Sequence, residues 1–207
     1  MLSIEGLLSI ENENLKEAAQ ALSKDELQQL VELLCEKDDK IRYQAFLLLK
    51  ERSMSDNGVY QYWDIFKEKL NSENSYQRSI GLMLIAGNAE WDEDNRLEDT
   101  IDDYLQLLTD EKPITVRQCI QALSNIVTYK KNLQPKIAKS LLSIDLQEVR
   151  ETMRKSILID ILNVLAIIRK YQTSDEIERY IRGVLSGDLL DKKAKKQMEE
   201  TFNFRIF

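Results

Sequence analysis

The chain has 207 residues, of which 43% are hydrophobic and 31% charged, and its net charge at pH 7 is −7. This much apolar surface can offset the entropy of the chain, which excludes a disordered protein. The chain has no His and only two cysteines, Cys35 and Cys119. That composition excludes His-dependent triads and dyads, His-containing metal sites and four-cysteine zinc or iron–sulfur sites. We therefore expect no catalytic residue, no metal site and no cofactor.

The N-terminal stretch MLSIEGLLSIENENL has no basic start, and Glu5 and Glu11 flank its short apolar segment. It therefore does not resemble a signal peptide. No apolar run approaches the ~20 residues needed to cross a bilayer. Both cysteines lie in helical patterns, and we interpret them as reduced small hydrophobes. We expect a cytoplasmic protein that does not bind membranes.

Helices are expected along the whole chain, because only two prolines and six glycines interrupt it and apolar residues recur with helical spacing. An N-terminal capping helix occupies part of 3–21, within residues 1–23. Four helix pairs fill residues 24–171, and a C-terminal capping pair follows over 172–207. The paired helices are expected at 24–36 and 39–51, 58–70 and 75–87, 96–109 and 115–129, 133–143 and 146–171, and 174–186 and 189–203. The fold class is all-α, and residues 1–207 form a single domain.

Four of the expected helices begin with a capping signal, a side-chain oxygen that accepts a free backbone amide. Ser23 to Glu26 is a complete capping box, and Thr115 to Gln118 and Thr173 to Glu176 have the same form. Asp145 to Glu148 is a looser version. Each such cap stabilises its helix by about 1 kcal/mol.

An arginine recurs near the start of the second helix of each pair. Arg42, Arg78 and Arg117 are spaced by 36 and 39 residues. For the fourth pair, Arg150 gives a spacing of 33 and Arg154 a spacing of 37, and both assignments stay open. A fixed period in this range is typical of stacked helix pairs, since one pair cannot bury its apolar face alone. We interpret each Arg as a structural joint that reaches a carboxylate or a free carbonyl, rather than as a ligand-binding residue.

The segments DDKIRYQA and PITVRQCIQAL, with SYQRSIGL as a weaker match, resemble the HEAT family, which is close to armadillo repeats. The resemblance covers roughly residues 24–171. It implies a right-handed α-α superhelix, an α-solenoid of HEAT-like helix pairs in which small residues such as Ala45 and Gly81 allow close helix packing. The chain is also similar to small bacterial HEAT-type proteins, some of which carry an iron–sulfur-assembly label. Two cysteines and no His give cluster ligation no support.

The candidate partner-binding residues are three amides and one tryptophan. Gln118, Gln121 and Asn125 share one face of a helix, at positions i, i+3 and i+7. The second helices of a solenoid line its concave side, so these amides either bind the backbone of a partner peptide or face solvent. Trp91 lies between two helix pairs, where it either anchors a partner or packs under a loop.

The segment 90–103 is the most acidic of the chain. Arg96 and Leu97 occupy positions that a calcium loop needs for an oxygen ligand and a glycine, so calcium is excluded. The segment is either an acidic helix N-terminus or a docking surface for a basic partner.

Asp160, within an apolar helix, is expected to form a structural ion pair, because an unpaired buried carboxylate is costly. The final phenylalanines, such as Phe202, either cap the core or dock onto another molecule.

Charge is unevenly distributed. Residues 1–109 hold 11 basic and 23 acidic residues, a net charge of −12, whereas residues 110–207 carry +5. We expect a non-enzymatic scaffold that binds a protein or peptide, and nucleic acid is an unlikely partner because the acidic half repels phosphate. The alternative is a HEAT-like alkylpurine DNA glycosylase or another nucleic-acid-binding protein. Trp91 has Asp94 at i+3 but Asn95 at i+4, so the aromatic and carboxylate spacing of those enzymes is not clearly met.

Overall fold

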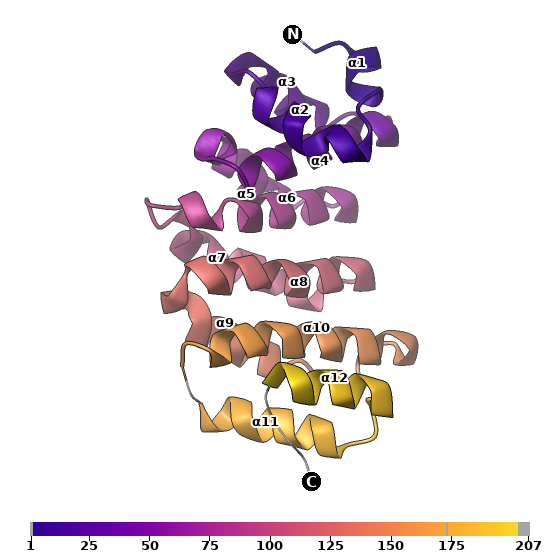
Figure 1. Ribbon diagram of the computed structural model, residues 1–207, viewed down its shortest axis with the longest axis vertical. Coiled ribbons are helices and arrows are strands. Elements are labelled where there is room, and N and C mark those ends of the chain that lie inside the picture. The colour runs from indigo at the N-terminus through magenta and orange to yellow at the C-terminus, as the bar shows by residue number, and fades with distance from the viewer. Residues whose placement is uncertain (1, 173, 203–207) are drawn as a thin grey trace. The chain divides into compact units, whose positions relative to one another are not determined.

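The structure of the protein is a computed structural model that describes residues 2–172 and 174–202 (Figure 1). All regular elements in these ranges are helical, which confirms the all-α class. The α-helices are α1 (Ile4–Leu8), α2 (Leu15–Ala21), α3 (Lys24–Leu33), α4 (Asp39–Ser53), α5 (Trp63–Leu70), α6 (Ser75–Gly87), α7 (Arg96–Gln106), α8 (Pro113–Tyr129), α9 (Gln134–Leu142), α10 (Glu151–Arg169), α11 (Asp175–Ser186) and α12 (Lys192–Phe202). Short 3₁₀ helices are η1 (Asn12–Asn14), η2 (Asn57–Tyr62), η3 (Ala89–Trp91), η4 (Leu107–Thr109) and η5 (Lys131–Leu133).

Backbone contacts divide the chain into two compact units. Unit 1 is Met1–Tyr104 and unit 2 is Leu105–Phe207. Residues 105–109 carry no charge, so the difference in charge seen in the sequence coincides with this boundary. Unit 1 therefore has a net charge of −12 and unit 2 a net charge of +5.

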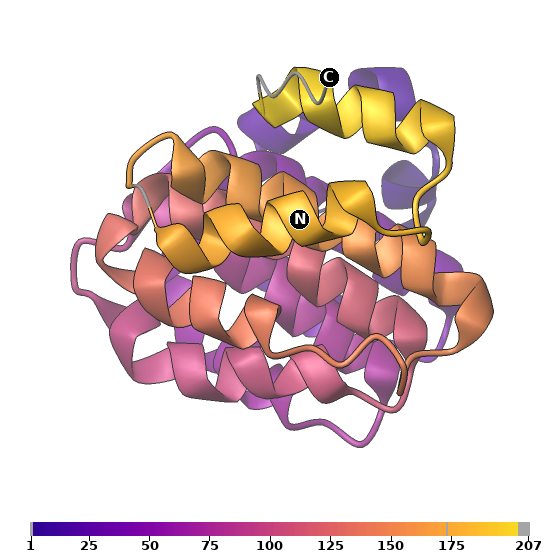
Figure 2. The same ribbon diagram turned by 90° about the horizontal axis from the view of Figure 1, so that it is seen from below.

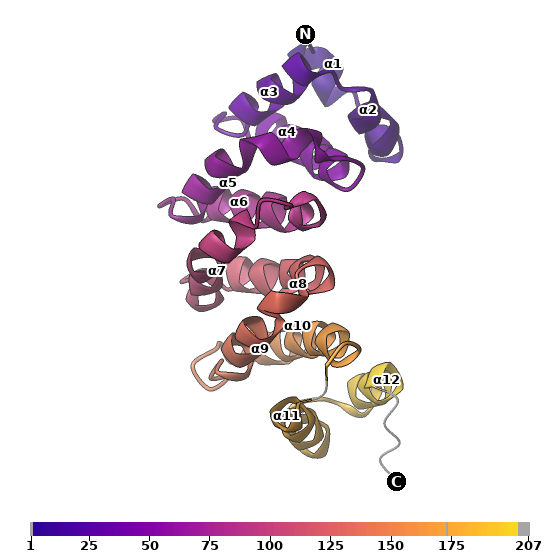
Figure 3. The same ribbon diagram turned by 90° about the vertical axis from the view of Figure 1, so that its left-hand side faces the viewer.

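Unit 1 is built around α4, which packs against α1, α2, α3 and α6, while α5 packs along α6 (Figure 3). The helices bury one apolar face each, and the largest fully buried side chains of the unit include Trp63, Phe66 and Tyr104. The close approach of α5 and α6 depends on Gly81. A Cβ atom at this position would lie 2.7 Å from the carbonyl oxygen of Phe66 and 2.9 Å from Cβ of Lys69. This agrees with the predicted role of a small residue there.

The N-terminal segment differs from the prediction of one capping helix. It forms two short helices, α1 and α2, joined through η1. The side chain of Gln44 in α4 donates to the carbonyl of Ile10 between them. The guanidinium of Arg52, near the end of α4, donates to the carbonyls of Ala19, Gln20 and Leu22 at the end of α2. These bonds satisfy carbonyls that a short helix leaves without partners.

In unit 2, α8 packs against α10, and α9 contacts both of them as well as α11 (Figure 2). The last helix, α12, packs against α10 and α11. Phe202 is 2% exposed, and its carbonyl accepts from Arg169 at 2.8 Å. Phe202 therefore caps the core of this unit. The remaining terminal residues, Phe204, Ile206 and Phe207, lie outside the described residues.

Two of the four helix starts predicted from capping signals are wrong. The complete capping box at Ser23 and Glu26 is present as predicted. Thr115, however, is buried in the first turn of α8, which begins at Pro113, because proline has no backbone N–H to lose and suits a first helical position. Asp145 accepts from the backbone N of Gln147 and forms a turn, and α10 begins only at Glu151. Thr173 lies outside the described residues, and Ser174 caps α11 by accepting from the backbone N of Ile177.

The recurring arginines are structural, as expected, but they bind in two ways. Arg42 donates to the carbonyl of Glu36 at 2.7 Å, and Arg78 donates to the carbonyls of Ser72 and Glu73 at 2.8 and 3.0 Å. Each thus ties its helix to the loop before it. In unit 1 the guanidinium of Arg42 also lies 4.8 Å from the ring centre of Tyr76, at the start of α6.

The fourth arginine of the series is Arg154. It donates to the carbonyls of Val149 and Gln147 at 2.9 and 2.8 Å, in the loop that precedes its helix. Arg150 lies in that loop and is exposed, with no side-chain hydrogen bond of this kind. Arg117 is the exception, because it binds the carboxylate of Asp160 in α10 rather than a loop carbonyl.

Candidate interaction site

The predicted amide face on α8 is only partly open. Gln121 and Asn125 are exposed, but Gln118 is half-buried, and its Oε1 is buried and accepts no hydrogen bond from the described residues. A buried oxygen cannot bind a peptide backbone without a change of rotamer. Two of the three predicted amides are therefore exposed on this face.

Gln121 is in turn engaged inside unit 2. Its Nε2 donates to Oδ1 of Asp160 at 3.0 Å, and Nε of Arg117 donates to Oδ2 of the same carboxylate at 2.7 Å. Asp160 is 6% exposed, so this is the structural ion pair expected from the sequence. The hydrogen bond to Asp160 raises the pKa of the Arg117 guanidinium. The cluster fixes α8 against α10 and leaves Asn125 without such a role.

Trp91 is half-buried in unit 1, and its indole Nε1 donates to the carbonyl of Ser53 at 2.7 Å. Ser53 is the last residue of α4, so the indole satisfies a helix-end carbonyl. The tryptophan therefore packs against its own unit on one side. It belongs to unit 1, whereas the three amides predicted alongside it belong to unit 2.

The acidic segment before α7 contains a structural carboxylate. Asp92 is 2% exposed and accepts from the backbone N of Arg96 and Leu97, and from the hydroxyl of Tyr60 at 2.9 Å. It thus satisfies the first amides of α7, across a turn in which Asn95 has a φ of 59°. Burial, and then the bond to Asp92, raises the pKa of Tyr60. Asp94 is exposed and accepts from the same hydroxyl at 3.4 Å.

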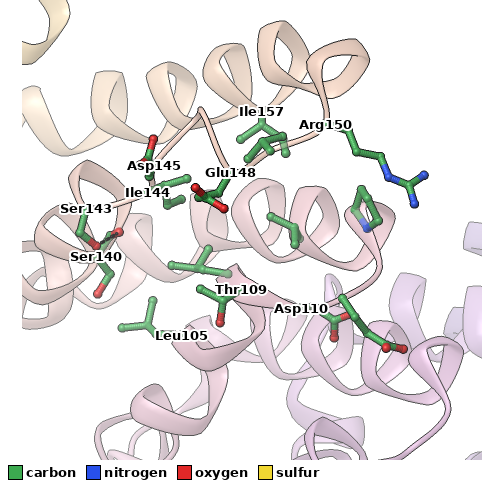
Figure 4. A pocket seen from close by; sticks show the side chains of 15 residues that line it. Leu105, Thr109, Asp110, Ser140, Ser143, Ile144, Asp145, Glu148, Arg150 and Ile157 are labelled. Carbon is green, nitrogen blue, oxygen red and sulfur yellow. Dashed lines mark hydrogen bonds between the residues drawn. The ribbon is translucent and has the colours of Figure 1, made fainter.

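A pocket that the sequence did not indicate lies in unit 2, with a volume of about 630 Å³. It is formed by the end of α7, η4, the start of α8, the end of α9, the loop between α9 and α10, and α10 itself (Figure 4). Its apolar wall consists of buried Leu108, Val116 and Ile157 and half-buried Leu105, Ile144 and Val149. None of the four predicted partner-binding residues lines it.

Four of the residues that line this pocket carry carboxylates. They come from two loops, Asp110 and Glu111 before α8, and Asp145 and Glu148 before α10. Asp110 and Asp145 each accept a backbone amide two residues ahead at 2.8 Å, which shapes both loops as turns. Because α10 begins only at Glu151, Glu148, Val149 and Arg150 lie in the loop that lines the pocket. Because the sequence signals at Asp145 were interpreted as a helix start, the pocket was missed.

The described residues thus form paired helices and a pocket with an apolar wall and four carboxylates among its lining residues. Comparisons with known proteins bear on the fold alone. No family model matches the chain, and no curated protein matches it. Two crystal structures of engineered proteins from the Northeast Structural Genomics Consortium are similar, with a TM-score of 0.59 each. They are 18% and 17% identical to this chain, and the matches cover 98% of it and 96% and 98% of theirs.

Within residues 2–172 and 174–202, Cys, Asp and Glu side chains do not converge in groups of three that could hold a metal ion. In the same ranges, none of the helices combines the length and apolar character needed to cross a bilayer.

Proposed function

We propose that the protein is a HEAT-like α-solenoid, a right-handed α-α superhelix, that acts as a non-enzymatic scaffold and binds another protein through the pocket of unit 2. The recurring arginine joints and the paired helices support the HEAT-like assignment. The single observation that carries the binding role is the pocket itself, because an open apolar cavity with polar groups at its rim is a typical place for a ligand side chain.

The size of the pocket favours a peptide segment over a large rigid surface. A volume of about 630 Å³ lies within the range of roughly 300–1,000 Å³ that holds small ligands. A side chain that enters it would bury apolar area at about 25 cal/mol per Å². The exposed amide of Asn125 remains a candidate for additional contacts on the same unit.

The test is a selection of random displayed peptides on the intact protein. A matched pair of variants locates the binding site. Ser143→Trp fills the mouth of the pocket, and Ser186→Trp places the same side chain at the end of α11, where the hydroxyl likewise donates to a carbonyl of its own helix. We expect the selected peptides to bind the wild type and the Ser186→Trp variant but not the Ser143→Trp variant.

Two results would overturn the proposed function. One is a selection that yields no peptide whose binding depends on Ser143→Trp. The other is release of an alkylated base from duplex DNA that is lost on Asp94→Asn, since this would favour the glycosylase alternative.

A further inference from the structure

We infer that Cys35 and Lys69 form a covalent sulfur–nitrogen cross-link when the protein is oxidised by hydrogen peroxide. This modification site lies in unit 1 and does not depend on the proposed function. Three features carry it: an exposed thiol, a buried amine in contact with that thiol, and a third side chain that holds the amine in place.

The thiol belongs to Cys35, which is exposed just after the end of α3. A small oxidant can therefore reach it from solvent. Attack of the thiolate on a peroxide gives a sulfenic acid, the first step of cysteine oxidation. The second thiol, Cys119, is fully buried in α8, so it is shielded from the oxidant in the native state. Oxidation should thus begin at Cys35.

The amine belongs to Lys69, in the last turn of α5. Its Nζ donates to Sγ of Cys35 at 3.4 Å, although the two residues are 34 positions apart in the chain. Lys69 is 7% exposed, which is unusual burial for a lysine. Reacting atoms 3–3.5 Å apart are at the separation from which attack proceeds. A nitrogen that can attack an oxidised sulfur is therefore already in contact with it.

Gln77, at the start of α6, keeps the amine beside the thiol. Its Oε1 accepts from Nζ of Lys69, and its Nε2 donates to the carbonyl of Leu34 at 2.7 Å. Leu34 immediately precedes Cys35, so one amide side chain links the amine to the backbone next to the thiol. The stem of Lys69 also packs against α6, because a Cβ added at Gly81 would lie 2.9 Å from the Cβ of the lysine. The amine is thus held in position.

The reaction consumes one molecule of hydrogen peroxide. The thiolate of Cys35 attacks one peroxide oxygen, the O–O bond breaks, and the sulfur is oxidised to a sulfenic acid while the other oxygen leaves as hydroxide. The ammonium of Lys69 releases a proton, which converts this hydroxide to water. The nitrogen lone pair then attacks the sulfur, and the S–O bond breaks as its oxygen takes a proton from the nitrogen and leaves as water. Thiolate, ammonium and peroxide thus give a sulfenamide and two molecules of water.

Contact favours this product over further oxidation. A second peroxide molecule must diffuse from solution to convert the sulfenic acid into a sulfinic acid, whereas the amine is already present. Well-oriented neighbouring groups react as if at effective concentrations of roughly 10⁵ M or more. Condensation with the nitrogen should therefore be faster, and it protects the sulfur from irreversible oxidation. A dithiol cleaves the S–N bond, becomes a disulfide, and restores both side chains.

The test treats the intact protein at low concentration with a slight excess of hydrogen peroxide. Protease digestion without reductant and mass spectrometry then identify the product. We expect two joined peptides, one with Cys35 and one with Lys69, whose mass is two hydrogen atoms below the sum of the separate peptides and which dithiothreitol separates. The Tm should rise by about 5 °C or more on oxidation and return on reduction, because the bond links residues 34 positions apart and restricts the unfolded chain.

Three variants test the named side chains. Lys69→Met keeps the buried stem but removes the nitrogen, so the cross-link should be lost and Cys35 should proceed to sulfinic acid. Lys37→Met removes an exposed lysine two residues from the thiol and should leave the cross-link intact. Gln77→Met should slow cross-linking by about tenfold or more, because the amine is no longer held. The rate at which maleimide labels Cys35 should not change in this variant, since the thiol itself stays exposed.

Each of three results would overturn the inference. They are a cross-link from Cys35 to Lys37, oxidation of wild-type Cys35 to sulfinic acid without a cross-link, and cross-linking that persists in Lys69→Met. The joined peptides of the wild type decide the question even if Lys69→Met does not fold. The proposed function is unaffected by these results, because its pocket lies in unit 2.

Discussion

At the scale of single residues, the space between packed helices determines which side chain a position can hold. Gly81 lies where α6 meets the backbone of α5, and Gly183 lies in α11 with nothing within 4 Å of an added Cβ. Both glycines lie in helices, so replacing each by Ala changes helix propensity in the same way. A difference in stability between the two variants therefore reports the effect of close packing.

Gly81→Ala is expected to destabilise the protein by about 1–3 kcal/mol, because the new Cβ would clash with the Phe66 carbonyl, which cannot move independently of its helix. Gly183→Ala is expected to stabilise by about 0.5–1 kcal/mol, the ordinary gain for a helix interior. Urea titration of both variants measures the two effects. A stabilised Gly81→Ala variant would contradict the close approach of α5 and α6.

The two cysteines should differ in reactivity. Cys35 is exposed, whereas Cys119 is fully buried in α8, and burial raises the pKa of its thiol. Because the thiolate is the reactive form, we expect a maleimide to label one thiol per native chain at neutral pH and both after unfolding. Mass spectrometry of the labelled protein identifies the residue. Rapid labelling of Cys119 in the native protein would show that α8 opens readily.

At the scale of helices, an arginine at the start of the second helix secures the preceding loop. Arg42, Arg78 and Arg154 all bind loop carbonyls, so they are equivalent despite different surroundings. Arg117 instead joins α8 to α10 through Asp160. Hydrogen bonds from these arginine side chains thus fix the conformation of the loops that precede the helices.

Arg154→Ala is expected to lower stability by about 1–2 kcal/mol, since two loop carbonyls lose a charged donor. Arg150→Ala, four residues earlier and exposed, is expected to stay within about 0.5 kcal/mol of wild type. Thermal melts of the two variants compare them directly. If Arg150→Ala proved the more damaging, the repeat would have the shorter spacing.

The start of α12 should respond to acid. A hydrogen bond from Lys155, and then one from the backbone N of Ala194, lower the pKa of Asp191. A lowered folded-state pKa means that Asp191 stabilises the protein above its unfolded pKa of about 3.9 and that this contribution is lost as pH falls through the folded value. The Tm difference between wild type and Asp191→Asn should therefore be present at pH 7 and shrink toward pH 3. Asp188→Asn, which alters an exposed carboxylate nearby, is the control, and a pH-independent difference would refute the mechanism.

At the scale of the whole molecule, the strongest packing within each unit is between helices that are adjacent in the chain, such as α5 and α6, or next but one, such as α8 and α10. Assemblies of this kind open locally, because each unit has its own core. We expect Gly81→Ala to speed amide hydrogen exchange in unit 1 more than in unit 2. Exchange followed by mass spectrometry of peptides measures this, and equal acceleration throughout the chain would mean that the two units unfold as one.

Most of the helix positions followed from the sequence by itself, with the N-terminal segment and the start of α10 as exceptions. Apolar periodicity is a local property, and the starts of α3, α4 and α6 were predicted to the residue, with the Ser23 box confirmed. Capping signals proved less reliable where a second local signal competed. Pro113 displaced the start expected at Thr115, and the side chain of Asp145 closed a turn rather than a helix.

Only the tertiary structure decided the candidate site. The pocket joins residues of separate elements, from Leu105 in α7 to Ile157 in α10, and it includes the loop that precedes α10. Burial of one oxygen of Gln118 and the bond from Trp91 to the end of α4 likewise depend on neighbours distant in sequence. The periodicity of apolar residues indicates which face of a helix is buried, but it does not indicate which loops lie together. Composition and spacing therefore determined the fold class, whereas the packing of the loops determined the site.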